Sequence, residues 1–265
     1  MSGWISTLDA AAMDPAQLRG AVRTEMARAK VLRIVGAQPG SAPLDFWQAV
    51  GDVLGRRAER LEDSVSGEQT AADGGWMDVR FEPDRLDTYR HANVGQPLHT
   101  DGAYSSAGQD IGLFFLERQA EAGGESLFLD AETIVERLGA EDPELLARLM
   151  STPVAFGKGS TAGTTSTILY RKAGRRKVNW NWFRVLPGQG EAIERLREDF
   201  RLLLERLVDE HVATATRLQS GDAVFFRDDE VLHGRQGYTA KVSGDRLLWK
   251  TYFTADTALA TVEAA

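Results

Sequence analysis

Two short segments, far apart in the chain, place the strongest constraint on how this sequence can fold. His99 and Asp101 lie two residues apart in the segment 97–102, and His233 lies in the segment 231–235. In an extended segment, residues i and i+2 point to the same side, so the side chains of His99 and Asp101 can converge. Two imidazoles and one carboxylate can hold a metal on one face and leave its other positions open. If these three residues act together, the fold must bring the two segments side by side.

The His-x-Asp pattern carries little weight by itself. The chain has four His and 39 Asp and Glu residues, so such a pair also arises by chance. A histidine that precedes a turn aspartate, with the carboxylate hydrogen-bonded to the backbone, explains the triplet equally simply. His233, taken alone, is equally well explained as a histidine satisfied beside a turn. The remaining sequence has to decide between these interpretations.

Composition narrows the class of protein. The 265 residues are 43% hydrophobic, which is typical of a single soluble domain with a substantial core. We expect no membrane partner, because no apolar run approaches the length of a bilayer span, and the start of the chain lacks the pattern of a secretion signal. A cytoplasmic enzyme is therefore expected. The formal charge of −8 argues against a nucleic-acid partner. Because the chain has no cysteine, only His, Asp and Glu remain as strong metal ligands.

The periodicity predicts one mainly β domain over residues 1–265, a β-sandwich or jelly roll with flanking helices and a helical N-terminal part over about residues 1–60. Helices are expected over 15–30, 43–57, 131–138, 143–150 and 192–211. Strands are expected over 31–35, 77–81, 86–91, 111–116, 126–129, 223–226 and 246–253.

Residues 158–180 have an unusual composition. Small polar residues come first, basic residues follow at Arg171, Lys172, Arg175, Arg176 and Lys177, and aromatic residues stand at Trp180, Trp182 and Phe183. One interpretation is a lid whose cations meet an anionic substrate. A solvated hairpin is the equally plain alternative, because charge runs are usually solvated faces.

Further motifs occur in a fixed order around the two histidine segments. Leu98–Tyr104 is followed by Gly123-Gly124-Glu125-Ser126, by Leu232-His233-Gly234-Arg235, and by Arg246 on a predicted closing strand. In this order, over about residues 88–253, the sequence resembles the TauD/TfdA family of Fe(II)- and 2-oxoglutarate-dependent dioxygenases. The resemblance implies a double-stranded β-helix, or jelly roll.

The resemblance also implies roles for individual residues. His99, Asp101 and His233 match the Fe(II) ligands, and Arg246 matches the arginine that pairs with the distal carboxylate of 2-oxoglutarate. Ser126 stands where the family usually has a threonine on that carboxylate, and Lys250 stands where many members have a second arginine. For Arg246 alone, a surface salt bridge to Asp228 or Asp229 is the competing interpretation. Candidate substrate-binding residues are Asn93, Tyr104, Arg175, Arg176 and Trp182.

The implied reaction consumes O2 and 2-oxoglutarate and yields succinate and CO2. Because Asp101 keeps the carboxylate that halogenating relatives lack, we expect hydroxylation of a small anionic or amino-acid-like substrate. Desaturation, epimerisation or cyclisation at the same site stay open, as does a non-catalytic jelly-roll binding protein. The G-x-G-x-x-A pattern of Gly157–Ala162 does not indicate a dinucleotide site, because the position about 20 residues on is Lys177 and not an acid.

Overall fold

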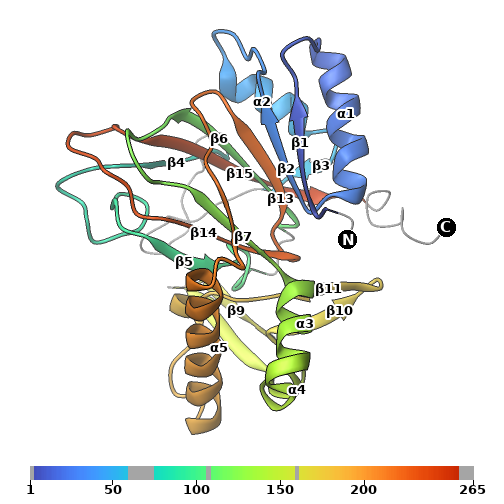
Figure 1. Cartoon of the computed structure of the whole chain (residues 1–265), viewed down its shortest axis with the longest axis vertical. Coiled ribbons are helices and arrows are strands. Elements are labelled where there is room, and N and C mark those ends of the chain that lie inside the picture. The colour runs from blue at the N-terminus through green and yellow to red at the C-terminus, as the bar shows by residue number, and fades with distance from the viewer. Residues whose placement is uncertain (1–2, 59–74, 106–108, 159–160, 257–265) are drawn as a thin grey trace.

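The structure is a computed structural model that describes residues 3–58, 75–105, 109–158 and 161–256. Its centre is a pair of facing β-sheets. The larger sheet has the strand order β1-β2-β13-β6-β15-β3, with β4 also paired to β15, and the smaller sheet has the order β12-β7-β14-β5. Apart from the parallel pair β1 and β2, the pairs within these two sheets are antiparallel. Figure 1 shows helices α1 and α2 beside the larger sheet and α3, α4 and α5 below the smaller one.

The strands of the larger sheet are β1 (Ile5–Asp9), β2 (Val31–Val35), β3 (Gly55–Arg57), β4 (Met77–Arg80), β6 (Ile111–Arg118), β13 (Ala223–Arg227) and β15 (Leu247–Ala255). The smaller sheet contains β5 (Gln96–His99), β7 (Ser126–Asp130), β12 (Thr214–Thr216) and β14 (Val231–Arg235). Two hairpins stand apart, formed by β8 (Val154–Lys158) with β9 (Thr161–Ser166) and by β10 (Leu169–Lys172) with β11 (Arg175–Val178).

The helices are α1 (Pro15–Arg28), α2 (Pro43–Gly51), α3 (Ala131–Glu141), α4 (Pro143–Ser151) and α5 (Glu191–Asp209), with a single 3-10 turn η1 (Trp182–Arg184). The capping box of Asp14 and Gln17 begins α1 as the Asp-Pro signal predicts. Helix α5 buries Ile193, Leu196, Phe200, Leu203, Leu204 and Leu207, a spacing of three and four that places one apolar face on the core. Among the described residues, no helix has both the length and the apolar character needed to cross a bilayer.

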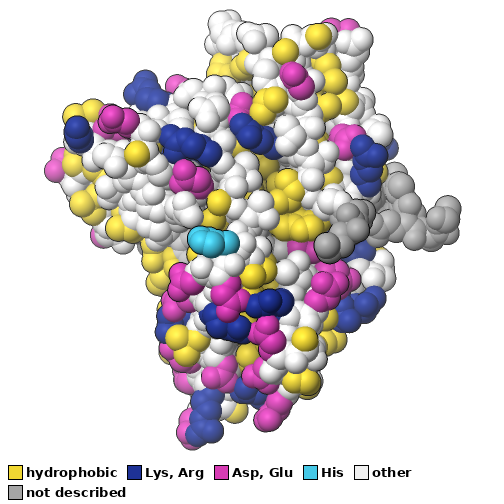
Figure 2. Space-filling view, in the orientation of Figure 1, with side chains coloured by type: hydrophobic (Ala, Val, Ile, Leu, Met, Phe, Trp, Pro, Cys, Tyr) yellow, Lys and Arg dark blue, Asp and Glu magenta, His cyan; other side chains and the backbone are white. Residues whose placement is uncertain are grey.

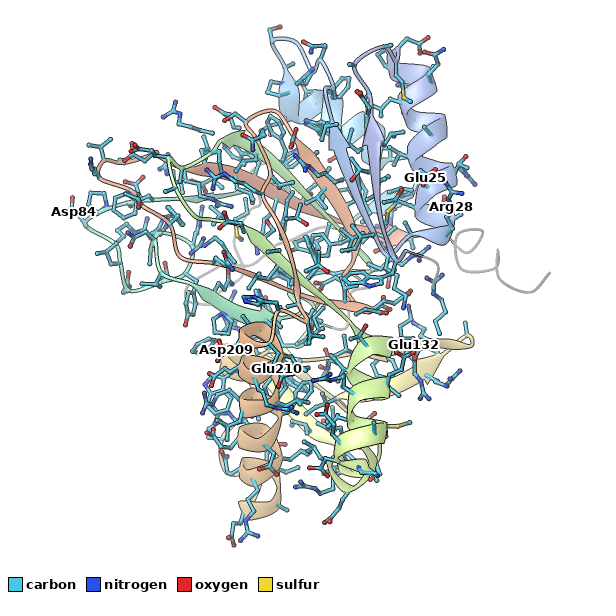
Figure 3. The ribbon with its side chains drawn as sticks, viewed as in Figure 1. Glu25, Arg28, Asp84, Glu132, Asp209 and Glu210 are labelled. Carbon is cyan, nitrogen blue, oxygen red and sulfur yellow. The ribbon has the colours of Figure 1, made fainter. Side chains whose placement is uncertain are left out.

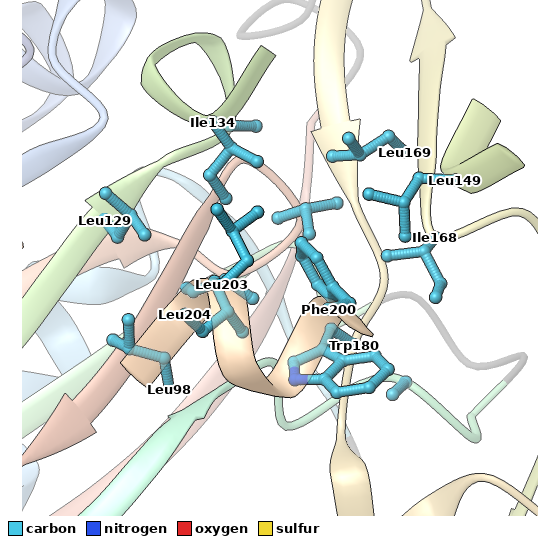
Figure 4. Packing of buried hydrophobic residues seen from close by; sticks show 14 of the residues in the cluster. Leu98, Leu129, Ile134, Leu149, Ile168, Leu169, Trp180, Phe200, Leu203 and Leu204 are labelled. Carbon is cyan, nitrogen blue, oxygen red and sulfur yellow. The ribbon is translucent and has the colours of Figure 1, made fainter. Parts of the chain in front are cut away.

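The three larger hydrophobic clusters of the described residues follow from this layering. Between the sheets lie inward-facing residues such as Phe114, Phe128, Phe226 and Leu248. A second core packs α1 and α2 on the outer face of the larger sheet, around Trp47. The third packs α3, α4, α5 and the hairpins against the outer face of the smaller sheet, with Trp180 and Phe200 in edge-to-face contact (Figure 4). The outer surface of these helices carries basic and acidic side chains side by side (Figure 2), as a solvated face should.

The mainly β architecture with flanking helices is confirmed, but two local predictions are wrong. The helix expected over 43–57 ends at Gly51, because the chain there must approach β15: a Cβ on Gly51 would lie 2.1 Å from the Phe253 ring, and Gly55 starts β3 at φ +153°. Residues 86–91 form turns and no strand, with the amides of His91 and Ala92 both donating to the Thr88 carbonyl. The N-terminal part also contains β1, which the sequence analysis did not predict.

Candidate active site

His99, Asp101 and His233 converge between the sheets. His99 ends β5 and His233 lies directly opposite it on β14, with ring centroids 4.3 Å apart. Asp101 follows two residues later, and its two carboxylate oxygens lie 3.6 Å from His99 Nε2 and 3.3 Å from His233 Nε2. The three candidate ligand atoms lie within 4.8 Å of one another, and all three residues are buried. Two imidazoles and one carboxylate therefore point at one place.

The other ring nitrogen of each histidine is held by its surroundings. His99 Nδ1 lies 2.9 Å from the carbonyl of Pro97, and His233 Nδ1 lies 3.2 Å from the carboxylate of Asp228. Such contacts orient a metal-ligating imidazole and fix the tautomer that leaves Nε2 available to the metal. Asp228 also accepts hydrogen bonds from the backbone amides of Asp101 and Gly102, at 3.2 and 2.9 Å. One buried carboxylate therefore ties together the two ligand-bearing segments.

The ionised carboxylate of Asp101 governs the charges in the cluster. Burial by itself would raise the pKa of Asp101, but Lys250 and the two histidines hold it well below its usual range. Burial opposes protonation of His233, yet its contacts with Asp101 and Asp228 raise its pKa to about 9. The pKa of His99 is lowered by burial and by the neighbouring His233. The ionised carboxylate thus attracts a proton to His233, and a metal would have to displace this proton in order to bind. The donor set of two imidazoles and one carboxylate fits a divalent metal such as Fe(II).

Lys250, which the sequence resemblance assigned to the cosubstrate, lies beside the candidate metal ligands. Its Nζ is 2.8 Å from Asp101 Oδ2, and the hydroxyl of Tyr252, two residues further on β15, donates to the same oxygen. Alternation along the strand places both side chains on its inward face. Lys250 also lines the cavity next to the ligands.

Arg246 is a buried cation for which the described residues supply no counter-ion. Only 2% of the residue is exposed, its Nε makes no hydrogen bond, and no carboxylate pairs with it in the described part of the chain. Burial, together with the charge of nearby Arg235, lowers the pKa of Arg246 to about 10. The surface salt bridge to Asp228 or Asp229 is therefore wrong. An unpaired guanidinium of this kind fits the carboxylate of 2-oxoglutarate, which would supply the missing charge.

The surroundings of Arg246 are closely fitted. A Cβ on Gly124 would lie 3.2 Å from Arg246 Nε, and Gly124 has φ +77°, so the Gly-Gly turn is required by both space and conformation. The Tyr238 ring centroid is 5.3 Å from the Arg246 guanidinium carbon. Ser126, which is also buried, faces Arg235 across the β7–β14 pair.

A cavity of about 320 Å³ opens in front of the ligands and is lined by both His99 and Asp101. Two of the predicted substrate-binding residues, Tyr104 and Trp182, line it. Asn93 is not among its lining residues, and its backbone carbonyl accepts a hydrogen bond from the amide of Tyr238. One wall comes from the turns around Tyr89, which the Arg235 side chain anchors by donating to the carbonyls of Tyr89, Ala92 and Val94.

The structure does not bring Arg175 and Arg176 to this cavity. Arg175 donates to the fully buried carboxylate of Glu230 at 2.7 Å, and Arg176 lies 3.4 Å from Glu132. Figure 3 shows Glu132 at the end of α3 that faces the β10–β11 hairpin. These cations are engaged by acidic side chains of α3 and of the β13–β14 turn, so the hairpin is bound to the scaffold through them. The cations that do line the cavity include Lys158 and Arg184, which the sequence analysis did not select.

The fold and the site together define a jelly-roll protein with a buried candidate metal centre of two histidines and one carboxylate. The family described as "Taurine catabolism dioxygenase TauD, TfdA family" matches residues 7–252. The chain belongs to this family, and the resemblance seen in the sequence motifs is confirmed.

The relatives and solved structures named below share at most about a quarter of their aligned residues with this chain. Two curated proteins named uridine-5'-phosphate dioxygenase, from a Streptomyces and an Amycolatopsis species, are each 25% identical to this chain, over 62% and 67% of its length. The alignments span 63% and 68% of those relatives. Asparagine oxygenase superposes with a TM-score of 0.69 at 13% identity, covering 96% of this chain and 94% of that one. The non-haem iron oxygenase OrfP, in complex with Fe and alpha-ketoglutaric acid, superposes with a TM-score of 0.66 at 15% identity, covering 91% and 82%. At these identities the structural similarities establish the shared fold.

Proposed function

We propose that this protein is an Fe(II)- and 2-oxoglutarate-dependent dioxygenase that hydroxylates an unactivated C–H bond of a small anionic or amino-acid-like substrate. One oxygen atom of O2 enters the substrate as a hydroxyl group and the other enters succinate, while 2-oxoglutarate loses CO2. The observation that carries the proposal is the convergence of His99, Asp101 and His233 beside a cavity that His99 and Asp101 line, together with the buried Arg246, which has no counter-ion among the described residues.

Different residues would bind the metal and the cosubstrate. His99, Asp101 and His233 would hold the iron, which when bound supplies the oxygen chemistry. Arg246 would pair with the distal carboxylate of 2-oxoglutarate and Ser126 would add one hydroxyl donor, which together orient the cosubstrate. Lys250 would set the position of the Asp101 carboxylate, to which it donates. The apolar core between the sheets keeps bulk water from the centre.

The substrate class is supported by the cavity. Its lining combines aromatic side chains, among them Tyr89, Tyr104 and Phe183, with cationic ones. The named relatives act on a nucleotide, and solved structures with this fold contain hydroxyasparagine or L-Arg. We therefore place nucleotide monophosphates and polar amino acids first among the candidates.

The test is a screen for substrate-dependent succinate formation by the purified protein with Fe(II), 2-oxoglutarate and O2. Candidates are uridine 5′-phosphate, L-asparagine, L-arginine and related acids. Mass analysis of the product separates the gain of one oxygen atom from the loss of two hydrogens, and so hydroxylation from desaturation. His99→Ala, Asp101→Ala and His233→Ala should each abolish succinate formation, because three protein ligands leave no redundancy. His211→Asn, a change at the exposed end of α5, should leave it intact. Full activity in any of the three ligand variants would refute the assignment.

A further inference from the structure

Arg184 presents a guanidinium to the cavity, and no described residue gives it a hydrogen-bond or ion-pair partner. Arg184 lies at the end of η1, where its backbone amide donates to the Asn181 carbonyl at 2.9 Å, and its side chain lines the cavity in front of the metal ligands. The guanidinium makes a cation–π contact with Tyr104, whose ring centroid is 5.5 Å from the guanidinium carbon. Arg175 and Arg176 of the β10–β11 hairpin, by contrast, are paired with acids.

A second cation meets the same ring. Lys158, at the end of β8, is only 4% exposed, and its Nζ lies 5.5 Å from the Tyr104 ring centroid. The two segments run side by side, because Phe156 of β8 forms a β-bridge with Val185, just after η1. Lys158 of β8 and Arg184 of η1 therefore reach one aromatic ring from neighbouring segments and line the same cavity. Two cations gathered at one ring favour an anionic group between or beside them.

This arrangement is fixed relative to the metal ligands. Thr100, which stands between His99 and Asp101, donates its backbone amide to the Trp180 carbonyl at 2.6 Å, and the Trp180 amide donates to Thr100 Oγ1 at 3.2 Å. The Asn181 side chain then accepts the Phe183 amide and so begins the turn that ends at Arg184. The position of Arg184 is thus set by hydrogen bonds to the ligand-bearing segment itself.

Tyr104 is held in the same way. The carbonyl of its neighbour Ala103 accepts hydrogen bonds from Thr164 Oγ1 at 2.8 Å and from Asn179 Nδ2 at 3.2 Å. The ring is 3% exposed. A rigid ring with a cation from each of two segments is a preorganised recognition element, because little side-chain freedom is lost when a ligand arrives.

We infer that Arg184, with Lys158 and the Tyr104 ring, forms a subsite that binds a phosphate or carboxylate group of the substrate and thereby directs a neighbouring C–H bond toward the metal centre. A guanidinium fork pairs with two oxygens of either group, which fixes orientation as well as affinity. The inference rests on the proposed function in that the bound anion belongs to the oxidised substrate. Arg184 and Lys158, and not Arg175 and Arg176, would then be the cations that recognise the substrate.

Binding can be measured apart from turnover. Protein loaded with Co(II) and saturated with 2-oxoglutarate, so that the cosubstrate position is filled, is titrated calorimetrically with matched probes. To test phosphate recognition, the affinity of uridine 5′-phosphate is compared with that of uridine and with that of inorganic phosphate alone. To test carboxylate recognition, the affinity of benzoate is compared with that of benzamide. We expect one charged probe to bind more tightly than its neutral partner. Arg184→Gln should weaken that probe roughly 10- to 100-fold, the effect of losing a hydrogen bond to a charged group, and Arg184→Lys should recover part of the loss.

Arg171→Gln is the matched control, since it removes the same charge from an exposed position on the β10–β11 hairpin. It should leave the affinity of every probe unchanged. Equal affinities for charged and neutral partners, or equal losses in Arg184→Gln and Arg171→Gln, would overturn the subsite.

The two proposals fail separately. If Arg184-dependent anion binding is found but no candidate supports succinate formation, the subsite stands and the oxygenase proposal does not gain support. If a substrate of the screen is turned over by Arg184→Gln with unchanged KM and kcat, the oxygenase stands and the subsite is wrong.

Discussion

Replacing Arg246 by methionine should change cosubstrate binding and stability in opposite directions. The guanidinium is 2% exposed and its pKa is lowered to about 10 by burial. At about 1.36 kcal/mol per pKa unit, holding this charge in the folded protein costs about 3 kcal/mol. The cost applies at pH 7, where the side chain is charged in both the folded and the unfolded chain. Methionine fills a similar volume without charge, so the free energy of unfolding without cosubstrate should rise by about 1–3 kcal/mol.

Binding of 2-oxoglutarate should weaken in the same variant by about 2–5 kcal/mol, the usual loss when one partner of a desolvated charge pair is removed. Ser126→Ala should weaken it by only about 1 kcal/mol, as one hydroxyl donor does. Calorimetric titration of 2-oxoglutarate into the Co(II)-loaded protein measures the affinity, and urea unfolding measures stability with and without the cosubstrate. Bound 2-oxoglutarate stabilises the folded protein, and wild type binds it more tightly than Arg246→Met. Saturating 2-oxoglutarate should therefore reduce or reverse the difference in free energy of unfolding between the variant and wild type.

Arg118→Met is the matched control, since it removes an arginine from an exposed position at the end of β6. It should leave both quantities nearly unchanged. Wild-type affinity for 2-oxoglutarate in Arg246→Met would refute the assignment of the cosubstrate position. A loss of stability in that variant would refute the view of Arg246 as a charge that awaits its partner.

Three further predictions follow from the site and its supports. Asp228→Ala should weaken Co(II) binding roughly 10- to 100-fold, because His233 loses the carboxylate beside its Nδ1 and two amides of the ligand segment lose their acceptor. Wild-type affinity in calorimetry would contradict this role. Glu230→Gln should lower the free energy of unfolding by about 2–4 kcal/mol at pH 7, because Arg175 and Lys177 lose a buried partner. Burial alone would raise the pKa of Glu230, but Lys177 and Arg175 lower it, so this contribution is present at neutral pH and is lost as the pH falls below about 4.5. A difference between wild type and variant that does not shrink in acid urea titrations would count against the pairing. For the candidate lid at 158–180, amide exchange in β9 should slow when substrate is added anaerobically, because Thr164 is hydrogen-bonded to Ala103 beside the cavity. Exchange in β10–β11 should not change. Unchanged exchange in β9 would mean that the segment has a structural role and does not close over the site.

The sequence by itself was sufficient to group the candidate metal ligands and to predict the layers of the fold. His99 and Asp101 could be grouped because alternation along an extended segment is a local property, independent of the rest of the chain. The buried face of α5 and the apolar run of β6 were likewise local patterns, and both appear in the structure. His233, Ser126 and Arg246 were selected from the order of motifs, and the fold buries all three.

Only the tertiary structure decided which charges face the cavity. Arg175 and Arg176 stand in a basic run that suggested substrate binding, but Glu230 and Glu132 from other elements take them up. Arg184, which no run of charge marked, is turned into the cavity by hydrogen bonds between Trp180 and Thr100. The position of a long charged side chain depends on partners that folding brings from distant parts of the chain, and local sequence holds no record of that pairing.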